Sequence, residues 1–314
     1  EVSPGRVTFL CILKACGNVL DAFQGMLVHH QIIYSGFESD KAIESCLIDM
    51  YMKCQNVDNA YNVLSSAETP NVASYNAFMG GCIENRLFFL AIQCFWKMPT
   101  KPNIITYCSI LKACNEIQDL CQGRCVHSNI VDNGFDTDSN FAGSLVRMYS
   151  NFGRIEEAIH VFQHASERKI CLWNALMTAY VHNDAGMFAI SLYKQMQSEC
   201  IRPDNVTFSS ITKACGMANQ LRIGMSIHDQ IVKSRLEQDS GVANMLIYMY
   251  MRCGILDEAM KVFDGLSDRD AVSWGAIISG YIQHGCGALA LEMFERMQHE
   301  GIHPGKATFL CALK

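Results

Sequence analysis

Three sets of residues in this chain have side chains and spacings that could support metal or thiol chemistry. His299, Glu300 and His303 match the H-E-x-x-H signature, in which two imidazoles on one helix face bind zinc. The periodic histidines His29, His127 and His228 are further potential ligands, and sixteen cysteines are spread along the chain. Whether any of these sets forms a site depends on the elements that position them.

The sequence context argues against a metal site in each case. Gly301 and Pro304 mark a helix end within the H-E-x-x-H stretch, so its histidines are not expected to share a helical face. The periodic histidines fall in separate layers of the repeat array described below, too far apart for one metal ion. No C-x-x-C pair occurs, so the cysteines are expected to be reduced core residues, and no metal or cofactor is predicted. A metallopeptidase remains an alternative that metal analysis would test.

Composition and charge narrow the class of protein. Half of the 314 residues are hydrophobic and only six are proline, which favours a well-buried helical chain over a disordered one. The net charge of -6 argues against duplex DNA as a partner, because counterion release from many phosphate contacts requires a positive excess. Splayed single-stranded bases are bound by stacking and hydrogen bonds and tolerate this charge. No apolar run is long enough to span a membrane. The chain begins with Glu1 and stops in mid-pattern, so we expect an internal fragment.

An internal repeat organises the whole sequence. Lys14, Lys112, Lys213 and Lys314 lie 98, 101 and 101 residues apart by subtraction, and the series Ala60, Ala158, Ala259 keeps the same spacing. Each long period divides into three units of 35, 31 and 35 residues. The expected units are 6-40, 41-71, 72-103, 104-138, 139-169, 170-204, 205-239, 240-270 and 271-305.

The ends of the chain and one deletion complete this scheme. Residues 1-5 end a preceding unit and residues 306-314 open a tenth. Unit 72-103 is three residues short between Met98 and Pro102, so its second helix should lose about one turn.

Each unit reads as two amphipathic helices. Phe9, Ile12, Leu13 and Cys16 recur at helical spacing in a first helix, and Ile155, Ala158, Ile159 and Phe162 do so in a second. A helical hairpin with one apolar face is buried only when the next hairpin stacks on it. The predicted fold is therefore all-α: a right-handed superhelical α-solenoid of helix-turn-helix repeats with a concave groove.

The ordered units resemble the pentatricopeptide repeat family, specifically the plant organellar subclass in which long, short and standard repeats alternate. Long-type units show the segments 111-114 (LKAC) and 123-127 (GRCVH), and a short-type unit shows 249-254 (MYMRCG) followed by 257-259 (DEA). A standard unit shows 173-176 (WNAL) and ends in 201-204 (IRPD). Tetratricopeptide repeats, the nearest helical alternative, have a uniform period of about 34.

The resemblance implies that each repeat reads one RNA base with the fifth residue of its first helix and the last residue of the unit. Ser45 with Asn71 then resembles an adenine reader, and Asn76 with Asn103 a cytosine-preferring pyrimidine reader. Asn174 with Asp204 and Asn244 with Asp270 resemble uracil readers. The expected target is N-A-C-N-N-U-N-U-N, read 5′ to 3′.

The remaining pairs depart from this pattern. Gly143 with Lys169 and Gly275 with Gly305 lack a fifth side chain that could hydrogen-bond a base. The long-type pairs Leu10 with Asp40, Cys108 with Asp138 and Ser209 with Asp239 belong to a repeat type that reads poorly in the family. By the same resemblance, Val7, Ile105, Val206 and Val272, each the second residue of its unit, would sandwich the bases.

A simpler interpretation of these polar residues is that an Asp before a helix is only an N-cap, and that an early Asn is only a solvated side chain.

The function implied is sequence-selective binding of single-stranded organellar RNA, in a mitochondrion or plastid, by an RNA-processing factor of the C-to-U editing type. Other editing factors are implied as partners. The deaminase signature H-x-E with P-C-x-x-C is absent, so catalysis is expected beyond Lys314 or from a partner, and no catalytic residue is predicted here. The alternative function is a protein-interaction scaffold whose groove binds a peptide.

Overall fold

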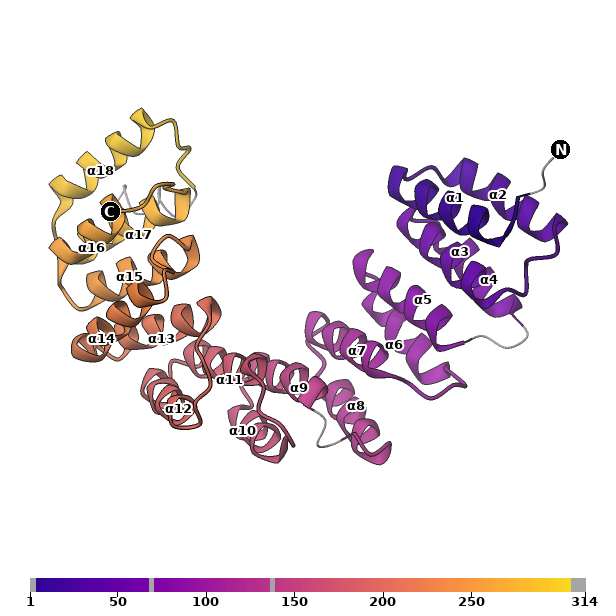
Figure 1. The fold of residues 1–314 in the computed structure, drawn as a ribbon, viewed down its shortest axis with the longest axis horizontal. Helices are drawn as coiled ribbons and strands as arrows, with labels where there is room; N and C mark the ends of the chain where they lie inside the picture. Colours follow the sequence, from indigo (N-terminus) through magenta and orange to yellow (C-terminus); the bar gives the residue numbers. More distant parts are fainter. Residues whose placement is uncertain (1–3, 68–70, 136–138, 306–314) are drawn as a thin grey trace. The chain divides into compact units, whose positions relative to one another are not determined.

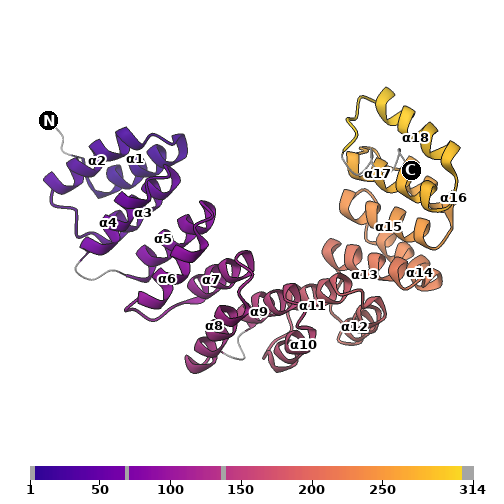
Figure 2. The ribbon, with the colours of Figure 1, turned by 180° about the vertical axis from the view of Figure 1, so that it is seen from behind.

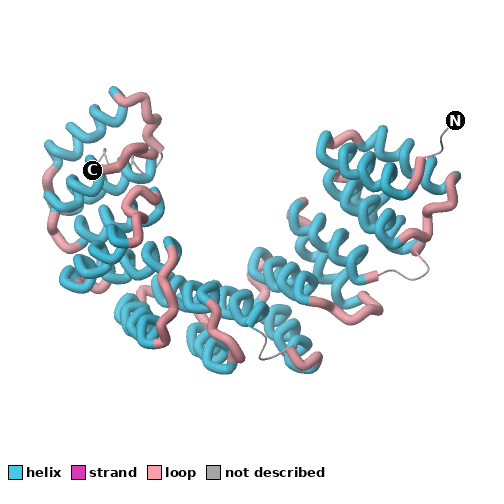
Figure 3. The backbone as a smooth tube through the Cα atoms, in the orientation of Figure 1, coloured by secondary structure: helices cyan, strands magenta, loops and turns pink. Residues whose placement is uncertain are grey.

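A computed structural model describes residues 4-67, 71-135 and 139-305, and these residues fold into helices joined by loops, with no strand among them (Figure 3). The all-α prediction is thus confirmed for this part of the chain. The helices form two compact parts, Glu1–Phe152 and Gly153–Lys314, which are called unit 1 and unit 2 and each contain several of the repeat units named by their residue ranges. No helix in the described ranges is both long and apolar enough to cross a membrane.

The helix bounds are as follows. Unit 1 holds α1 (Arg6–Val19), α2 (Ala22–Tyr34), α3 (Lys41–Lys53), α4 (Val57–Ser66), α5 (Val72–Glu84), α6 (Phe88–Lys97), α7 (Ile104–Glu116), α8 (Leu120–Asp132) and α9 (Ser139–Asn151). Unit 2 holds α10 (Ile155–His164), α11 (Ile170–His182), α12 (Gly186–Ser198), α13 (Asn205–Met217), α14 (Leu221–Lys233), α15 (Ser240–Arg252), α16 (Leu256–Asp264), α17 (Ala271–Gln283) and α18 (Gly287–His299).

Within each unit the helices lie in two layers, which can be followed from both sides in Figures 1 and 2. Within unit 1 each odd-numbered helix from α1 to α9 packs on the next odd-numbered helix, and within unit 2 the same holds from α11 to α17. Most even-numbered helices instead pack on the odd-numbered helices before and after them; α10 packs on α11, and α18 packs on α17. Side chains at equivalent places on successive odd-numbered helices therefore line one face of each unit, which we call the odd-helix face.

Short polar side chains begin most of the odd-numbered helices. Asp40, Asn71, Asn103, Asp204, Asp239 and Asp270 are each an N-cap whose side chain accepts hydrogen bonds from backbone N–H groups of the first turn. Such a cap satisfies donors that have no partner within the helix. The second helix of unit 72-103 is about one turn short, as expected from the three-residue deletion. This helix, α6, has 10 residues, whereas α12 and α18 have 13 each.

The apolar stripes predicted from spacing form the core. Phe9 and Leu13 are fully buried in α1, and Ala158 is fully buried in α10. Ala60 and Ala259 are equally inaccessible at the matching places in α4 and α16. Because no side chain larger than a methyl group lies there, the second helices of the short units approach their neighbours closely.

The periodic histidines join neighbouring helix pairs through hydrogen bonds to tyrosines. Nδ1 of His29 lies 2.9 Å from the hydroxyl of Tyr51, and His228 and Tyr250 are 2.8 Å apart in the same way. His127 repeats the contact in α8. Burial lowers the pKa of both His29 and His228 below the usual value of 6.5, which favours the neutral ring.

The H-E-x-x-H stretch does not present two histidines on one helix. Helix α18 ends at His299, and Gly301 adopts a left-handed backbone with φ of 76°, so His303 lies outside the helix. Nowhere in the described ranges do three His, Cys, Asp or Glu side chains come together as a metal site.

Candidate nucleic-acid interface

The fifth residue of a first helix and the last residue of its unit meet across two successive odd-numbered helices. The last residue is the N-cap of the next odd-numbered helix, and the fifth residue lies one turn into the preceding one. Their side chains thus share the odd-helix face. Two of the five predicted pairs are joined by direct hydrogen bonds. The other three pairs are not.

Asn174 and Asp204 form the most completely bonded pair. Nδ2 of Asn174 donates to both carboxylate oxygens of Asp204, at 3.0 and 3.1 Å. The Oγ1 hydroxyl of Thr207 lies 2.7 Å from Oδ1 of Asn174. Because a carboxylate can only accept, this network fixes which way the Asn174 amide faces. Only 7% of the surface of Asn174 is exposed, so the amide is held in one orientation before any ligand binds.

The two oxygens of Asp204 have different tasks. Oδ1 accepts from the backbone N–H of Thr207 at 2.8 Å and from Asn174 at 3.0 Å. The Thr207 hydroxyl oxygen also lies 2.8 Å from Oδ1, but its single proton serves Oδ1 of Asn174. Oδ2 accepts only from Asn174 among the described residues. Asp204 is therefore an N-cap and also presents an acceptor, Oδ2, with capacity for a further donor.

Asn76 and Asn103 repeat this network with one change of chemistry. Nδ2 of Asn76 donates to Oδ1 of Asn103 at 3.1 Å, and the Thr106 hydroxyl donates to Oδ1 of Asn76 at 2.7 Å. Oδ1 of Asn103 also accepts from the backbone N–H of Thr106. Since Oδ1 is occupied, the group that Asn103 has left for a ligand is Nδ2, a donor. The same place thus offers an acceptor at Asp204 and a donor at Asn103.

The other predicted pairs are not joined directly. The Ser74 hydroxyl lies between Ser45 and Asn71. It is 3.2 Å from the Ser45 hydroxyl and donates to Oδ1 of Asn71 at 3.3 Å. In unit 240-270, Asn244 is buried and its Oδ1 has no hydrogen-bond partner among the described residues, while Asp270 caps α17 through Oδ1.

In units 205-239 and 6-40, which were predicted to be long-type, the last residue is bonded to the first residue of the same unit. Nδ2 of Asn205 donates to Oδ2 of Asp239 at 3.1 Å, and Ser209 makes no hydrogen bond to Asp239 within the described structure. Arg6 likewise bonds Asp40 at 2.7 Å. Burial alone would raise the pKa of Asp40, but Arg6 and two backbone N–H groups outweigh it and lower the pKa. The carboxylates of Asp239 and Asp40 therefore bond to the first residue of their unit and not to the fifth. The third long-type pair includes Asp138, which lies outside the described residues.

Four aliphatic side chains stand exposed at the start of odd-numbered helices. Val7 is 69% exposed, Ile105 61%, Val206 48% and Val272 60%. Each is the second residue of its helix, beside the cap. Branched aliphatic side chains at equivalent exposed places gain nothing from folding, so their position is suited to contact with an apolar surface of a ligand.

Sequence reasoning missed Thr106 and Thr207, which orient the fifth-position amides. The signal was present, because each lies three residues after its cap and forms a capping box with it. The simpler N-cap interpretation is also correct as far as it goes: the caps do bind backbone N–H groups. Capping and presentation to a ligand are not exclusive, since they use different atoms of one side chain.

Comparisons with known proteins bear on this arrangement. The model of the PPR repeat family matches residues 168–217, and the PPR repeat model matches residues 73–102, 143–170, 242–270 and 272–302. Together these matches cover more than half of the chain. The chain belongs to the pentatricopeptide repeat family.

The curated relatives of this pentatricopeptide repeat chain are longer proteins. A chloroplastic pentatricopeptide repeat-containing protein of Arabidopsis thaliana is 30% identical over 315 residues, which are 99% of this chain and 36% of that protein. A mitochondrial one from the same plant is 32% identical over 305 residues, covering 96% of this chain and 44% of that protein. The chain therefore spans less than half the length of either relative.

Solved structures share the fold. The pentatricopeptide repeat protein PPR10 in complex with an 18-nt psaJ RNA element gives a TM-score of 0.75 at 19% identity, covering 99% of this chain and 47% of that chain. PPR10 from maize gives a TM-score of 0.64 at 16% identity, covering 98% and 46% respectively.

Proposed function

We propose that this pentatricopeptide repeat chain binds single-stranded RNA on the odd-helix face, at about one base per repeat. One observation carries the proposal: equivalent hydrogen-bond networks leave an acceptor free at Asp204 and a donor free at Asn103. A merely structural cap would not need a second, oriented amide beside it. The RNA-bound state of the structural neighbour PPR10 supports the same choice of ligand.

The chemistry of each free atom suggests which base it reads. Uracil presents N3–H, a donor, at the centre of its Watson-Crick edge, whereas cytosine presents N3 as an acceptor. Oδ2 of Asp204 would accept from uracil N3–H, and Nδ2 of Asn103 would donate to cytosine N3. The Asn174 and Asn76 amides would then contact the neighbouring exocyclic groups, directly or through water.

The proposal extends to the other pairs and to the bases between them. Ser45 with Asn71 is assigned adenine, Asn244 with Asp270 uracil, and Ser209 with Asp239 no defined base. The exposed aliphatic side chains, including Val206, would pack on base faces on either side. We retain the nine repeat bounds proposed from the sequence, and the odd-numbered helices that begin at 6, 41, 72, 104, 139, 170, 205, 240 and 271 support them.

A binding titration tests this function. Labelled RNA carrying N-A-C-N-N-U-N-U-N should bind more tightly than RNA with the specified bases exchanged, and more tightly than DNA of the same sequence. Equal affinity for the matched and exchanged RNAs would refute base reading. No affinity for either RNA, together with binding of a peptide, would instead favour the scaffold alternative.

We further propose that the whole protein is an organellar RNA-processing factor of the alternating long, short and standard subclass. The chloroplastic and mitochondrial names of its relatives support an organelle. The motif order of the sequence supports C-to-U editing, with this segment supplying recognition and not catalysis. Fusion of the full-length protein to a fluorescent reporter, with sequencing of organellar transcripts after its loss, tests both points.

A further inference from the structure

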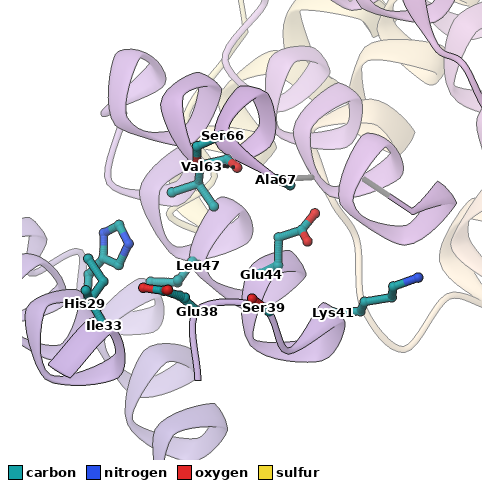
Figure 4. A pocket seen from close by; sticks show the side chains of 10 residues that line it. All are labelled: His29, Ile33, Glu38, Ser39, Lys41, Glu44, Leu47, Val63, Ser66 and Ala67. Carbon is teal, nitrogen blue, oxygen red and sulfur yellow. Dashed lines mark hydrogen bonds between the residues drawn. The ribbon is translucent and has the colours of Figure 1, made fainter. Parts of the chain in front are cut away.

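A cavity lined by α2, α3, α4 and the loop before α3 contains a largely buried carboxylate, that of Glu44. The cavity has a volume of about 330 Å³. Only 5% of the surface of Glu44 is exposed, and its Oε1 has no hydrogen-bond partner among the described residues. Figure 4 shows the carboxylate directed toward Ala67 at the end of α4, while the Lys41 side chain points away from it.

The other short units show that this carboxylate is not required by the fold. Glu44 occupies the fourth position of α3, and the same position is Ala142 in α9 and Ala243 in α15, both buried. Burying a carboxylate oxygen without a hydrogen-bond partner is unfavourable, so a repeat has no structural reason to replace a methyl group with a carboxylate.

The loop before α3 also differs from the equivalent loop in unit 2, whose side chain bonds to the end of the neighbouring helix. There Gln238 donates to the carbonyl oxygen of Gly265 at 3.0 Å and accepts from the backbone N–H and hydroxyl of Ser267, which ties the loop to the end of α16. Ser39 stands at the place of Gln238 and is too short to make this bridge.

We propose that this cavity binds an alkylammonium group, with Glu44 as its counter-ion. The carboxylates of Glu44 and Glu38 both line the cavity, and a compact ammonium can be bound by separate carboxylates, whereas a guanidinium is matched by two parallel hydrogen bonds. The walls formed by Ile33, Leu47 and Val63 suit an alkyl chain. A cavity of this size is far larger than a metal ion. The ammonium can belong to a free aliphatic polyamine or to a lysine side chain of a partner protein.

Calorimetric titration of the whole chain with n-pentylammonium tests the proposal. We expect millimolar or tighter binding that weakens at least about ten-fold in Glu44→Ala and Glu44→Gln. Asp58→Asn removes the same charge from an exposed site on α4 and should leave binding unchanged. Glu44→Ala restores the residue of the equivalent repeats, so it should fold and melt about 2–4 °C higher without ligand.

Two further ligands identify the source of the ammonium. Tighter binding of spermidine than of N-acetyl-lysine methylamide indicates a free polyamine, and the reverse order indicates a lysine side chain. Absence of binding of all three amines at 10 mM, or equal binding by wild type and Glu44→Ala, overturns the proposal. A lower melting temperature for Glu44→Ala would also overturn it, since Glu44 would then already have a stabilising partner within the protein.

Discussion

Replacing Asp204 by Asn should reverse the preference of one repeat from uracil to cytosine. The substitution changes one atom of the side chain, Oδ2, from an acceptor to an amide nitrogen that donates. The bond from Asn174 to Oδ2 is lost, but the bonds to Oδ1 can remain, because Oδ1 of Asn103 accepts from Asn76 and from the Thr106 backbone as Oδ1 of Asp204 accepts from Asn174 and the Thr207 backbone. The chain thus contains the expected geometry of the variant already.

The magnitude follows from the atoms that would face each other. In wild type, cytosine would place its N3 acceptor against the Asp204 carboxylate, leaving two acceptors opposed and one buried group unsatisfied, at about 1–3 kcal/mol. In Asp204→Asn the opposed groups are the amide donor and uracil N3–H, with a similar cost. Wild type should therefore prefer uracil, and the variant cytosine, by about 1–3 kcal/mol each, roughly 5- to 150-fold, so the preference moves by about 2–6 kcal/mol in total. Asp and Asn cap helices about equally well, so stability should change little.

The assay is fluorescence anisotropy with RNAs that carry each of the four bases at the sixth nucleotide of the proposed target. Asn103→Asp is the reciprocal variant and should move the third nucleotide from cytosine to uracil. Asp204→Ser removes the carboxylate but retains a capping hydroxyl, and it should also shift the sixth position toward cytosine. Other nucleotides and the salt dependence should stay nearly unchanged, because no charge on a phosphate contact is altered.

Two results would refute this reasoning. If Asp204→Asn weakens all four RNAs equally, Asp204 acts as a cap or a general electrostatic element and does not read a base. If the variant binds RNA with an unchanged ratio of affinities for uracil and cytosine at the sixth nucleotide, that base does not contact Asp204. Thermal unfolding of each variant separates both results from a loss of structure.

Three further predictions concern stability. Ala158→Asp should lower the free energy of unfolding by about 3 kcal/mol or more, measured by denaturant titration, because an unpaired charge would be buried at a fully inaccessible site; an unchanged midpoint would contradict the repeat register. In α5, Gly81→Ala should destabilise by about 1–3 kcal/mol, since the added Cβ would meet a methionine Cβ of α3 at 2.4 Å. At Gly80 an added Cβ would have no atom within 4 Å, so Gly80→Ala should stabilise by about 0.5–1 kcal/mol. Equal melting temperatures for the Gly80→Ala and Gly81→Ala variants would contradict this contrast. Since burial lowers the pKa of His29 and His228, the unfolded chain binds more protons than the folded one just below pH 6.5. The stabilisation is complete above pH 6.5 and is lost as pH falls through the folded pKa values, and the double His→Gln variant should show a shallower loss in unfolding titrations between pH 7 and 5.

The helical fold was predictable because repetition averages out local ambiguity. One amphipathic segment such as 155-162 leaves its boundaries uncertain, but residues at equivalent places in nine units fix the period and the two-helix unit. The buried alanines and the shortened α6 followed from the same alignment. The pairing of His29 with Tyr51 did not, although both series share one spacing, because a one-dimensional repeat does not say which series meet in space.

The sequence indicated which residues form the candidate site, but it did not indicate which hydrogen bonds join them. Asn174 and Asn244 occupy the same place in their units, yet the first is bonded to its cap residue and the second has an unsatisfied oxygen. The difference follows from neighbours: Asp204 is followed three residues later by Thr207, whereas Asp270 is followed by Ser273, whose hydroxyl donates to the Asp270 carbonyl oxygen. A hydroxyl committed to its own backbone cannot orient the amide of the preceding repeat.

Under the proposed reading scheme, these contacts set two conditions on the last residue of a unit. The residue must cap the next helix, which favours Asp, Asn, Ser and Thr, and it must also keep one polar atom free for a base. Asp meets both conditions with a free acceptor and Asn with a free donor, so a two-way choice between pyrimidines arises from the capping requirement itself. Lys169 shows the opposite case, because its side chain makes no capping hydrogen bond to α11 and offers no acceptor. A repeat that ends in such a residue contributes to the stack and to the spacing of its neighbours without selecting a base.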